Sequence, residues 1–301
     1  MKKINFKINK EDFNVWYLKG PKNSPVLHWA HGNGLNGRTY ENLLKNLSKF
    51  FHIYAWDARS HGLNHRIKRP AEANTYGQYV SDFKNLIELL YEKHSMPIVI
   101  AGHSFGATIC IKAEPELRGK VSKLVLADPV LFTPLANGVS QLLRFFKSKK
   151  PKNIYLAQNA AKRRDKWSTK AEAHLDLSKK NLFKNWDKLS FENYINYGTF
   201  DIGEGISLSC PRAIEALIFK KSESEFLRNT IMNLSVETHL YLASRGSPSF
   251  DKNSFFKSKK LKTFKILPSS NHLFPIEEYG NFSKAIVQHL IPTETKNLNH
   301  I

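Results

Sequence analysis

Short, unbroken runs of apolar residues, each separated from the next by helix-like segments, constrain the fold of this 301-residue chain more than any other feature. Such runs occupy residues 14–18, 26–30, 51–56, 98–101 and 123–127. A strand that is apolar on both faces has to be buried on both, as in a parallel sheet covered by helices. The pattern therefore predicts an α/β fold with a mostly parallel central sheet and helices on both faces.

Two signals mark helix ends between these runs. Thr75 and Gln78 have the spacing of a capping box, and the apolar residues that follow them recur on one helical face. The helix expected after residue 104 is cut short by Pro115.

The alternation of strands and helices stops near Thr133 and resumes near residue 235. The intervening segment has basic helical patterns and one strand-turn-strand pattern, at residues 199–208. Two further strands, at residues 239–243 and 262–267, and a last apolar-faced helix follow it. We predict a core of residues 1–133 and 235–301 and a largely helical cap inserted at 134–234. The polar residues 293–301 are expected to fray.

The charge balance is strongly basic, with 46 Lys and Arg against 26 Asp and Glu, a net charge of +20. A positive face attracts anionic partners, and a basic cap points to anionic or acyl-carrier-like substrates. The basic residues, however, form no nucleic-acid-binding motif. We expect a small-molecule substrate and no nucleic-acid partner. Weak binding to an anionic surface and the oligomeric state stay open.

Composition and segment length bear on location. No apolar run approaches the ~20 residues that a membrane-spanning helix needs, and the N-terminal residues lack the apolar stretch of a secretory leader. The chain has two cysteines, Cys110 and Cys210, which fit buried thiols in a reducing compartment. We expect a soluble cytoplasmic protein.

The segment Gly102-His103-Ser104-Phe105-Gly106 fits the pattern G-x-S-x-G. It lies between a buried-strand run and a helix-like stretch, which is the setting of a nucleophile elbow. Glycines are needed on both sides because larger side chains would collide across so sharp a turn. The pattern predicts that Ser104 is a nucleophile.

A serine hydroxyl needs a base, and His272 is in a suitable place. It lies in a loop after the last predicted strand and before the final helix. His28 and His31, on a strand, should point to opposite faces, so a metal site is not expected there. His61 and His65 flank a turn and are interpreted as structural.

The anion that forms during acyl transfer needs backbone N–H donors. His31-Gly32-Asn33-Gly34 follows the strand at residues 26–30, and its glycines allow close backbone approach. We predict an oxyanion hole made by the amide of Asn33 or Gly34 together with that of Phe105.

The order and spacing of these motifs resemble the α/β-hydrolase superfamily over nearly the whole chain. The matching pieces are residues 31–34, 57–62, 102–106, 126–129 and the His272 loop. Residues 197–216 also resemble a group of bacterial hydrolases without an assigned substrate. The resemblance implies an α/β-hydrolase fold.

The resemblance also bears on the acid that orients the histidine. Members of the superfamily commonly carry it in a Gly-x-x-Asp pattern after the strand that here is 239–243, but this chain has Gly246-Ser247-Pro248-Ser249. Other members take the acid from the end of the preceding core strand, where Asp128 stands. We assign Asp128, with Asp251 as the alternative. Asn64, where the family often has Ser, should affect turn bonding only.

The activity that the resemblance implies is that of a serine hydrolase, which cleaves a carboxylester or thioester of a small, partly apolar substrate through an acyl-enzyme. Leu35, Phe105, Leu131 and Phe132 are expected to line the substrate pocket. No cofactor or metal is expected, because the sequence has no P-loop, dinucleotide fingerprint or metal-ligand spacing. The alternatives are C–C bond hydrolysis or cofactor-free peroxidation at the same site, or a non-catalytic binding protein with a basic lipid- or nucleic-acid-binding surface.

Overall fold

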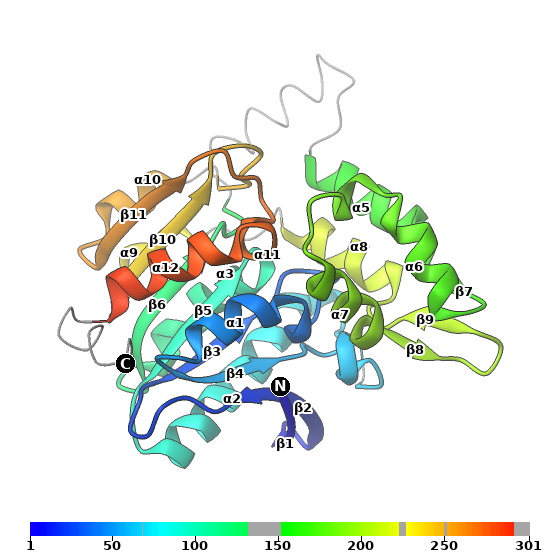
Figure 1. Ribbon diagram of the computed structural model, residues 1–301. Coiled ribbons are helices and arrows are strands. Elements are labelled where there is room, and N and C mark those ends of the chain that lie inside the picture. The colour runs from blue at the N-terminus through cyan, green and yellow to red at the C-terminus, as the bar shows by residue number, and fades with distance from the viewer. Residues whose placement is uncertain (68, 132–151, 223–226, 250–251, 292–301) are drawn as a thin grey trace.

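The central sheet has eight strands in the order β1-β2-β4-β3-β5-β6-β10-β11. The computed structural model describes residues 1–67, 69–131, 152–222, 227–249 and 252–291 (Figure 1). The strands are β1 (Lys2–Ile8), β2 (Glu11–Leu18), β3 (Val26–Ala30), β4 (His52–Trp56), β5 (Ile98–His103), β6 (Val121–Ala127), β10 (Glu237–Ala243) and β11 (Leu261–Leu267). Neighbours from β4 to β11 are parallel, while β1 and β2 join antiparallel at one edge. The predicted mostly parallel sheet is confirmed.

Helices cover both faces of the sheet (Figure 1). On one face α1 (Glu41–Leu47) contacts α12 (Tyr279–Leu290), which follows the short α11 (Phe274–Glu277). On the other, α2 (Thr75–His94) contacts α3 (Phe105–Ala113), and α9 (Arg228–Met232) contacts α3 and α10 (Lys252–Lys257). By these contacts α9 belongs with the core, although it lies inside the predicted insertion.

Strand β5 shows why the apolar runs do not alternate with polar residues. Ile98 and Ile100 lie in the hydrophobic cluster under α2 and α3, whereas Val99 and Ala101 lie in the cluster under α1 and α12. Because successive side chains of a strand point to opposite faces, both sets must be apolar when both faces are covered.

Residues 152–222 form a second group of elements, drawn in green to yellow in Figure 1. They comprise α5 (Lys152–Lys162), β7 (Lys166–Trp167), α6 (Lys170–Ser178), α7 (Lys188–Gly198), β8 (Thr199–Asp201), β9 (Ile206–Leu208) and α8 (Arg212–Lys221). The predicted strand-turn-strand is confirmed as the antiparallel pair β8–β9, which β7 extends to three strands. Helix α7 contacts the 3₁₀ helix Gly37–Tyr40, and α8 contacts α2, so the group is held against the segment after β3 and against α2.

Two local features differ from the sequence expectations. Strand β1 is not among the predicted strands; its residues are mostly polar, and it pairs with β2 at the edge of the sheet. The predicted capping box is wrong: Thr75 is the first residue of α2, and its N-cap, Asn74, makes no side-chain cap. Gln78 Oε1 instead accepts from the Ala71 N–H at 2.7 Å, which fixes the preceding turn.

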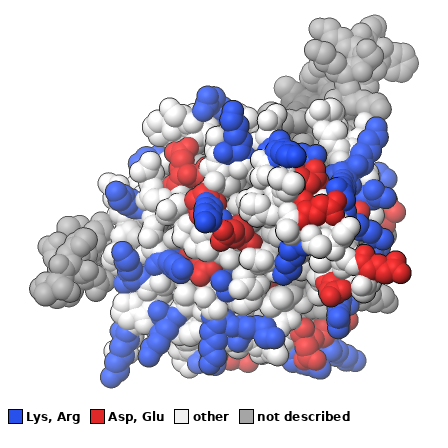
Figure 2. Space-filling view, turned by 45° about the vertical axis from the view of Figure 1, so that its right-hand side comes forward, with Lys and Arg blue, Asp and Glu red and all other residues white. Residues whose placement is uncertain are grey.

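The surface shown in Figure 2 carries Lys and Arg over much of its area, with Asp and Glu among them. Several basic side chains of residues 152–222 are paired with acids. These pairs are Arg163–Glu215, Arg164–Glu172, Lys180–Asp176, Lys188–Glu192 and Arg212–Asp165. No helix in the described part of the chain combines the length and apolarity that a bilayer crossing requires. Both cysteines are buried free thiols.

Candidate functional site

Ser104 stands on the turn between β5 and α3, as the motif predicts. Its backbone has φ 54° and ψ −116°, a conformation that residues other than glycine rarely adopt. The two flanking glycines make the turn possible: a Cβ on Gly102 would lie 2.6 Å from the Gly106 carbonyl carbon, and one on Gly106 would lie 2.2 Å from Ala30 O. The Ser104 N–H donates to Ala127 O at 2.9 Å, which ties the turn to β6.

His272 reaches Ser104 from the loop between β11 and α11. Its Nε2 lies 3.0 Å from Ser104 Oγ, and its Nδ1 lies 2.6 Å from Asp128 Oδ2. The three side chains come from loops after β5, β6 and β11, at the edge where the parallel strands end. The structure thus brings the predicted nucleophile, base and acid into one hydrogen-bonded chain.

Asp128 follows β6 and is fully buried, with φ 47°. Its second oxygen, Oδ1, accepts hydrogen bonds from Ser247 Oγ at 2.5 Å and from the Ala243 N–H at 3.3 Å. A buried carboxylate needs such donors, because an unpaired charge in the interior is costly. Ser247 is not among the predicted site residues; it lies in the Gly246–Ser249 segment, where the superfamily pattern would place the acid.

Ser249 occupies the place where the superfamily commonly carries the acid. Its hydroxyl donates to Pro129 O at 2.5 Å, and its N–H donates to Ser247 Oγ at 3.2 Å. Ser249 therefore supports the loop that carries Asp128. The alternative acid, Asp251, lies outside the described residues.

The loop after β3 supplies two of the three predicted oxyanion donors, and one of these is already engaged. The Gly34 N–H donates to His61 Nε2 at 3.2 Å, so it is committed to holding the loop. The N–H groups of Asn33 and Phe105 donate no hydrogen bond within the described residues. The Asn33 side chain donates to Glu215 O at 3.0 Å and so turns toward α8. All three stay predicted donors, and of these Gly34 is the one whose N–H already has an acceptor in the structure.

Buried histidines shape this loop. Burial lowers the pKa of His31 to about 3 and that of His61 to about 4, which keeps both rings neutral. A neutral ring has one donor and one acceptor. His31 Nε2 accepts from the Ala58 N–H at 2.9 Å, and His61 Nδ1 lies 3.0 Å from Arg59 O. Within the described residues no group of three or more His, Cys, Asp or Glu could hold a metal ion.

The turn at residues 57–64 is held by side-chain bonds, as expected of Asn64. Asn64 Oδ1 accepts from the Asn14 N–H at 2.8 Å, and its amide donates to Asp57 O. Asp57 in turn accepts from the Gly37 and Leu63 N–H groups.

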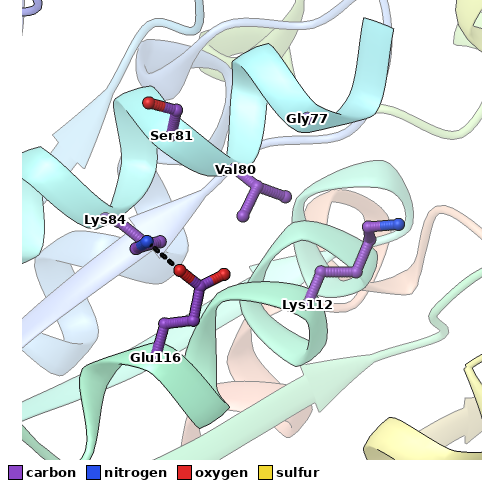
Figure 3. A pocket seen from close by; sticks show the side chains of 6 residues that line it. All are labelled: Gly77, Val80, Ser81, Lys84, Lys112 and Glu116. Carbon is purple, nitrogen blue, oxygen red and sulfur yellow. Dashed lines mark hydrogen bonds and ion pairs between the residues drawn. The ribbon is translucent and has the colours of Figure 1, made fainter. Parts of the chain in front are cut away.

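Of the predicted pocket residues, Leu35 and Leu131 are buried, at 9% and 1% exposure, while Phe132 lies outside the described residues. Phe105 is buried against Tyr76 and Tyr79. A separate pocket of about 350 Å³ lies between α2 and the end of α3 (Figure 3). It is lined by Gly77, Val80, Ser81, Lys84, Lys112 and Glu116, and Lys84 and Glu116 form an ion pair across it.

A mostly parallel sheet with a serine on a strained turn after β5 and a histidine after β11 defines an α/β-hydrolase. The chain belongs to the Hydrolase_4 family, described as serine aminopeptidase, S33, whose family model matches residues 21–186, more than half of the chain.

Curated relatives include the protein phosphatase methylesterase 1 of Candida glabrata, which is 30% identical over 132 residues, 38% of this chain and 34% of that protein. The protein of the same name from Saccharomyces cerevisiae is 25% identical over 138 residues, 40% of this chain and 34% of that protein. The match thus spans about a third of the length of these relatives.

Solved structures share the fold over nearly the full chain. An E-2-(acetamidomethylene)succinate hydrolase has a TM-score of 0.75 at 18% identity, covering 97% of this chain and 99% of that one. The peroxisomal α/β-hydrolase Lpx1 of Saccharomyces cerevisiae has a TM-score of 0.72 at 17% identity, with 93% and 81% covered. At these identities the likeness is one of fold.

Proposed function

We propose that this protein is a serine hydrolase that cleaves a carboxylester or thioester of a small, partly apolar substrate through an acyl-enzyme. The observation that carries this proposal is the hydrogen-bonded chain from Ser104 through His272 to the buried carboxylate of Asp128. A hydroxyl with a base in hydrogen-bond reach, and a base held by a third group, is the arrangement that activates a serine.

In the first half of the reaction, His272 Nε2 takes the proton of Ser104 as Oγ attacks the substrate carbonyl. Asp128 holds the ring through Nδ1 and stabilises the imidazolium that forms. The N–H groups of Asn33 and Phe105 stabilise the oxyanion, each contributing about 10² to 10³ in rate. The tetrahedral intermediate collapses when His272 returns the proton to the leaving alcohol or thiol.

In the second half, water attacks the acyl-serine and gives its proton to His272. The second tetrahedral intermediate then expels Ser104 Oγ, which regains the proton from His272. The products are a carboxylic acid and free enzyme, so no external reductant or oxidant is needed.

The substrate pocket in this proposal lies between the core loops and a cap at residues 134–234. Leu35 and Leu131, which we predict to line this pocket, are both buried. The contact between Asn33 and Glu215 of α8 supports a cap that reaches the oxyanion loop. Two relatives that this chain matches over about a third of their length are named methylesterases, and that name is consistent with ester cleavage.

The test is hydrolysis of p-nitrophenyl esters of increasing chain length, with an oxygen ester and a thioester of one acyl group compared. Replacing Ser104→Ala should reduce kcat by about 10⁶-fold, to near background. The matched control is Ser81→Ala, an exposed serine on α2, which should match the wild type. Wild-type turnover in Ser104→Ala would refute the proposal.

A further inference from the structure

We propose that His103, the residue before the nucleophile, is a positioning residue that holds the His272 loop and the oxyanion loop at a fixed spacing around Ser104. This inference rests on the proposed function for its kinetic consequence. His103 takes no part in the proposed proton transfers.

His103 lies at the centre of a buried chain of three hydrogen bonds. The Gly32 N–H donates to Tyr40 Oη at 3.0 Å, Tyr40 Oη lies 2.7 Å from His103 Nδ1, and His103 Nε2 lies 2.8 Å from the main-chain oxygen of His272. Tyr40 and His103 are each 1% exposed. This series of hydrogen bonds therefore connects the loop that carries Asn33 with the loop that carries His272.

The direction of each bond follows from the groups at its ends. The His272 carbonyl can only accept, so His103 Nε2 must carry the proton. Nδ1 of the neutral ring is then an acceptor, the Tyr40 hydroxyl donates to it, and the Tyr40 oxygen accepts from Gly32. Burial lowers the pKa of His103 well below its usual range, and the neighbouring His272 ring lowers it further. The hydrogen bonds require His103 to be neutral, and its buried surroundings favour the neutral form.

The position of His103 makes it a rigid spacer. It is the last residue of β5, whose backbone is paired with β3 and β6 on its two sides. The ring centroids of His103 and His272 are 4.8 Å apart, so a shift of one is felt by the other. His103 is the hydrogen-bond donor to the His272 carbonyl within the described residues. Without it, the main chain that carries the base loses its tie to the strand that carries the nucleophile.

Gly32 shows how closely the network is packed. A Cβ at this position would lie 3.1 Å from His103 Nδ1 and 3.3 Å from Tyr40 Oη. Both distances are tighter than most real Cβ contacts. A side chain at position 32 would therefore require His103 or Tyr40 to shift by a few tenths of an ångström.

Two substitutions with the same functional group separate the halves of the network. In His103→Gln the side-chain amide can reach the place of Nε2 and donate to the His272 carbonyl. In His103→Asn the shorter amide reaches only the place of Nδ1, where its oxygen can accept from Tyr40. Both remove the ring, so a loss of packing alone affects both.

We expect His103→Asn to lower kcat for ester hydrolysis by about 10- to 100-fold, with KM changed less than about threefold, because a base misplaced by a fraction of an ångström reacts slowly. His103→Gln should keep kcat within about threefold of the wild type. Thermal unfolding should place the two variants at similar Tm. Equal kcat in both variants, whether wild-type or reduced, would overturn the positioning role.

A spectroscopic measurement keeps this test separate from the proposed function. The proton between His272 Nδ1 and Asp128 should give a downfield ¹H NMR signal that is lost in His272→Gln. It should be kept in His103→Gln and broadened or shifted in His103→Asn. If the signal behaves so and no ester is cleaved, the proposed function fails while the positioning of His272 stands. An unchanged signal in His103→Asn would contradict the positioning role even in an active enzyme.

Discussion

The loops that follow β6 and β10 leave neighbouring strands at the same edge of the sheet, but their relations to His272 differ. The β6 loop presents a charge: Asp128 Oδ2 lies 2.6 Å from His272 Nδ1. The β10 loop has Ser249 where an acid is common in the superfamily, and its hydroxyl donates to Pro129 O. The β6 loop thus bonds the imidazole of His272, whereas the β10 loop bonds the β6 loop.

The comparison shows that the carboxylate bonded to His272 comes from the β6 loop, while the groups that support it come from β10 and its loop. The β10 loop gives Asp128 a hydroxyl donor from Ser247, and β10 itself gives an N–H donor from Ala243. In the same loop, Pro248 O accepts a hydrogen bond from the Leu131 N–H at 3.3 Å. The proposal that Asp128 is the catalytic acid rests on its bond to the imidazole, and the following predictions test it.

Among the substitutions in these two loops, the largest effect is expected from Asp128→Asn. The amide keeps the shape but favours the wrong histidine tautomer, so kcat should fall about 10⁴-fold. Steady-state ester hydrolysis measures it, with Asp251→Asn as the matched control, which should keep wild-type kcat. A strongly reduced kcat in Asp251→Asn together with a wild-type kcat in Asp128→Asn would show that Asp251, and not Asp128, is the acid.

A middle-sized effect is expected from Ser247→Ala. It removes a hydroxyl that donates to the carboxylate of Asp128, and a hydrogen bond to a charged group contributes about 1.5 kcal/mol or more. We expect kcat to fall about tenfold. Ser247→Thr keeps the hydroxyl and should restore most of the rate; equal loss in both variants would show that the bond to Asp128 is not the cause.

The smallest effect is expected from Ser249→Ala. Its hydroxyl bonds only the Pro129 carbonyl among the described residues, so its loss should lower the free energy of unfolding by about 1 kcal/mol and leave kcat within about twofold. Urea unfolding and ester hydrolysis on the same preparation measure both. A drop in kcat as large as that of Ser247→Ala would mean that Ser249 takes part in orienting the base.

The sequence predicted the parts of this site that depend on local geometry. The glycines of the Ser104 turn and the order of strands were enough to predict that Ser104 and His272 lie at one sheet edge. Asp128 needed the family resemblance, since an Asp before Pro129 also suits an ordinary turn.

Features that depend on distant partners were not predictable in the same way. The role of Ser247 depends on a contact across two strands, and the engagement of Gly34 depends on His61, 27 residues away. The Tyr40–His103 pair is 63 residues apart, and nothing in the spacing of G-x-S-x-G indicates what its second residue contacts.

The activation of Ser104 is tested most directly by mapping the site of a fluorophosphonate adduct with peptide mass spectrometry. In the wild type, the adduct should sit on the peptide that carries Ser104, and Asp128→Asn should label far more slowly. An adduct on a different serine, or none in a preparation that hydrolyses esters, would contradict the account.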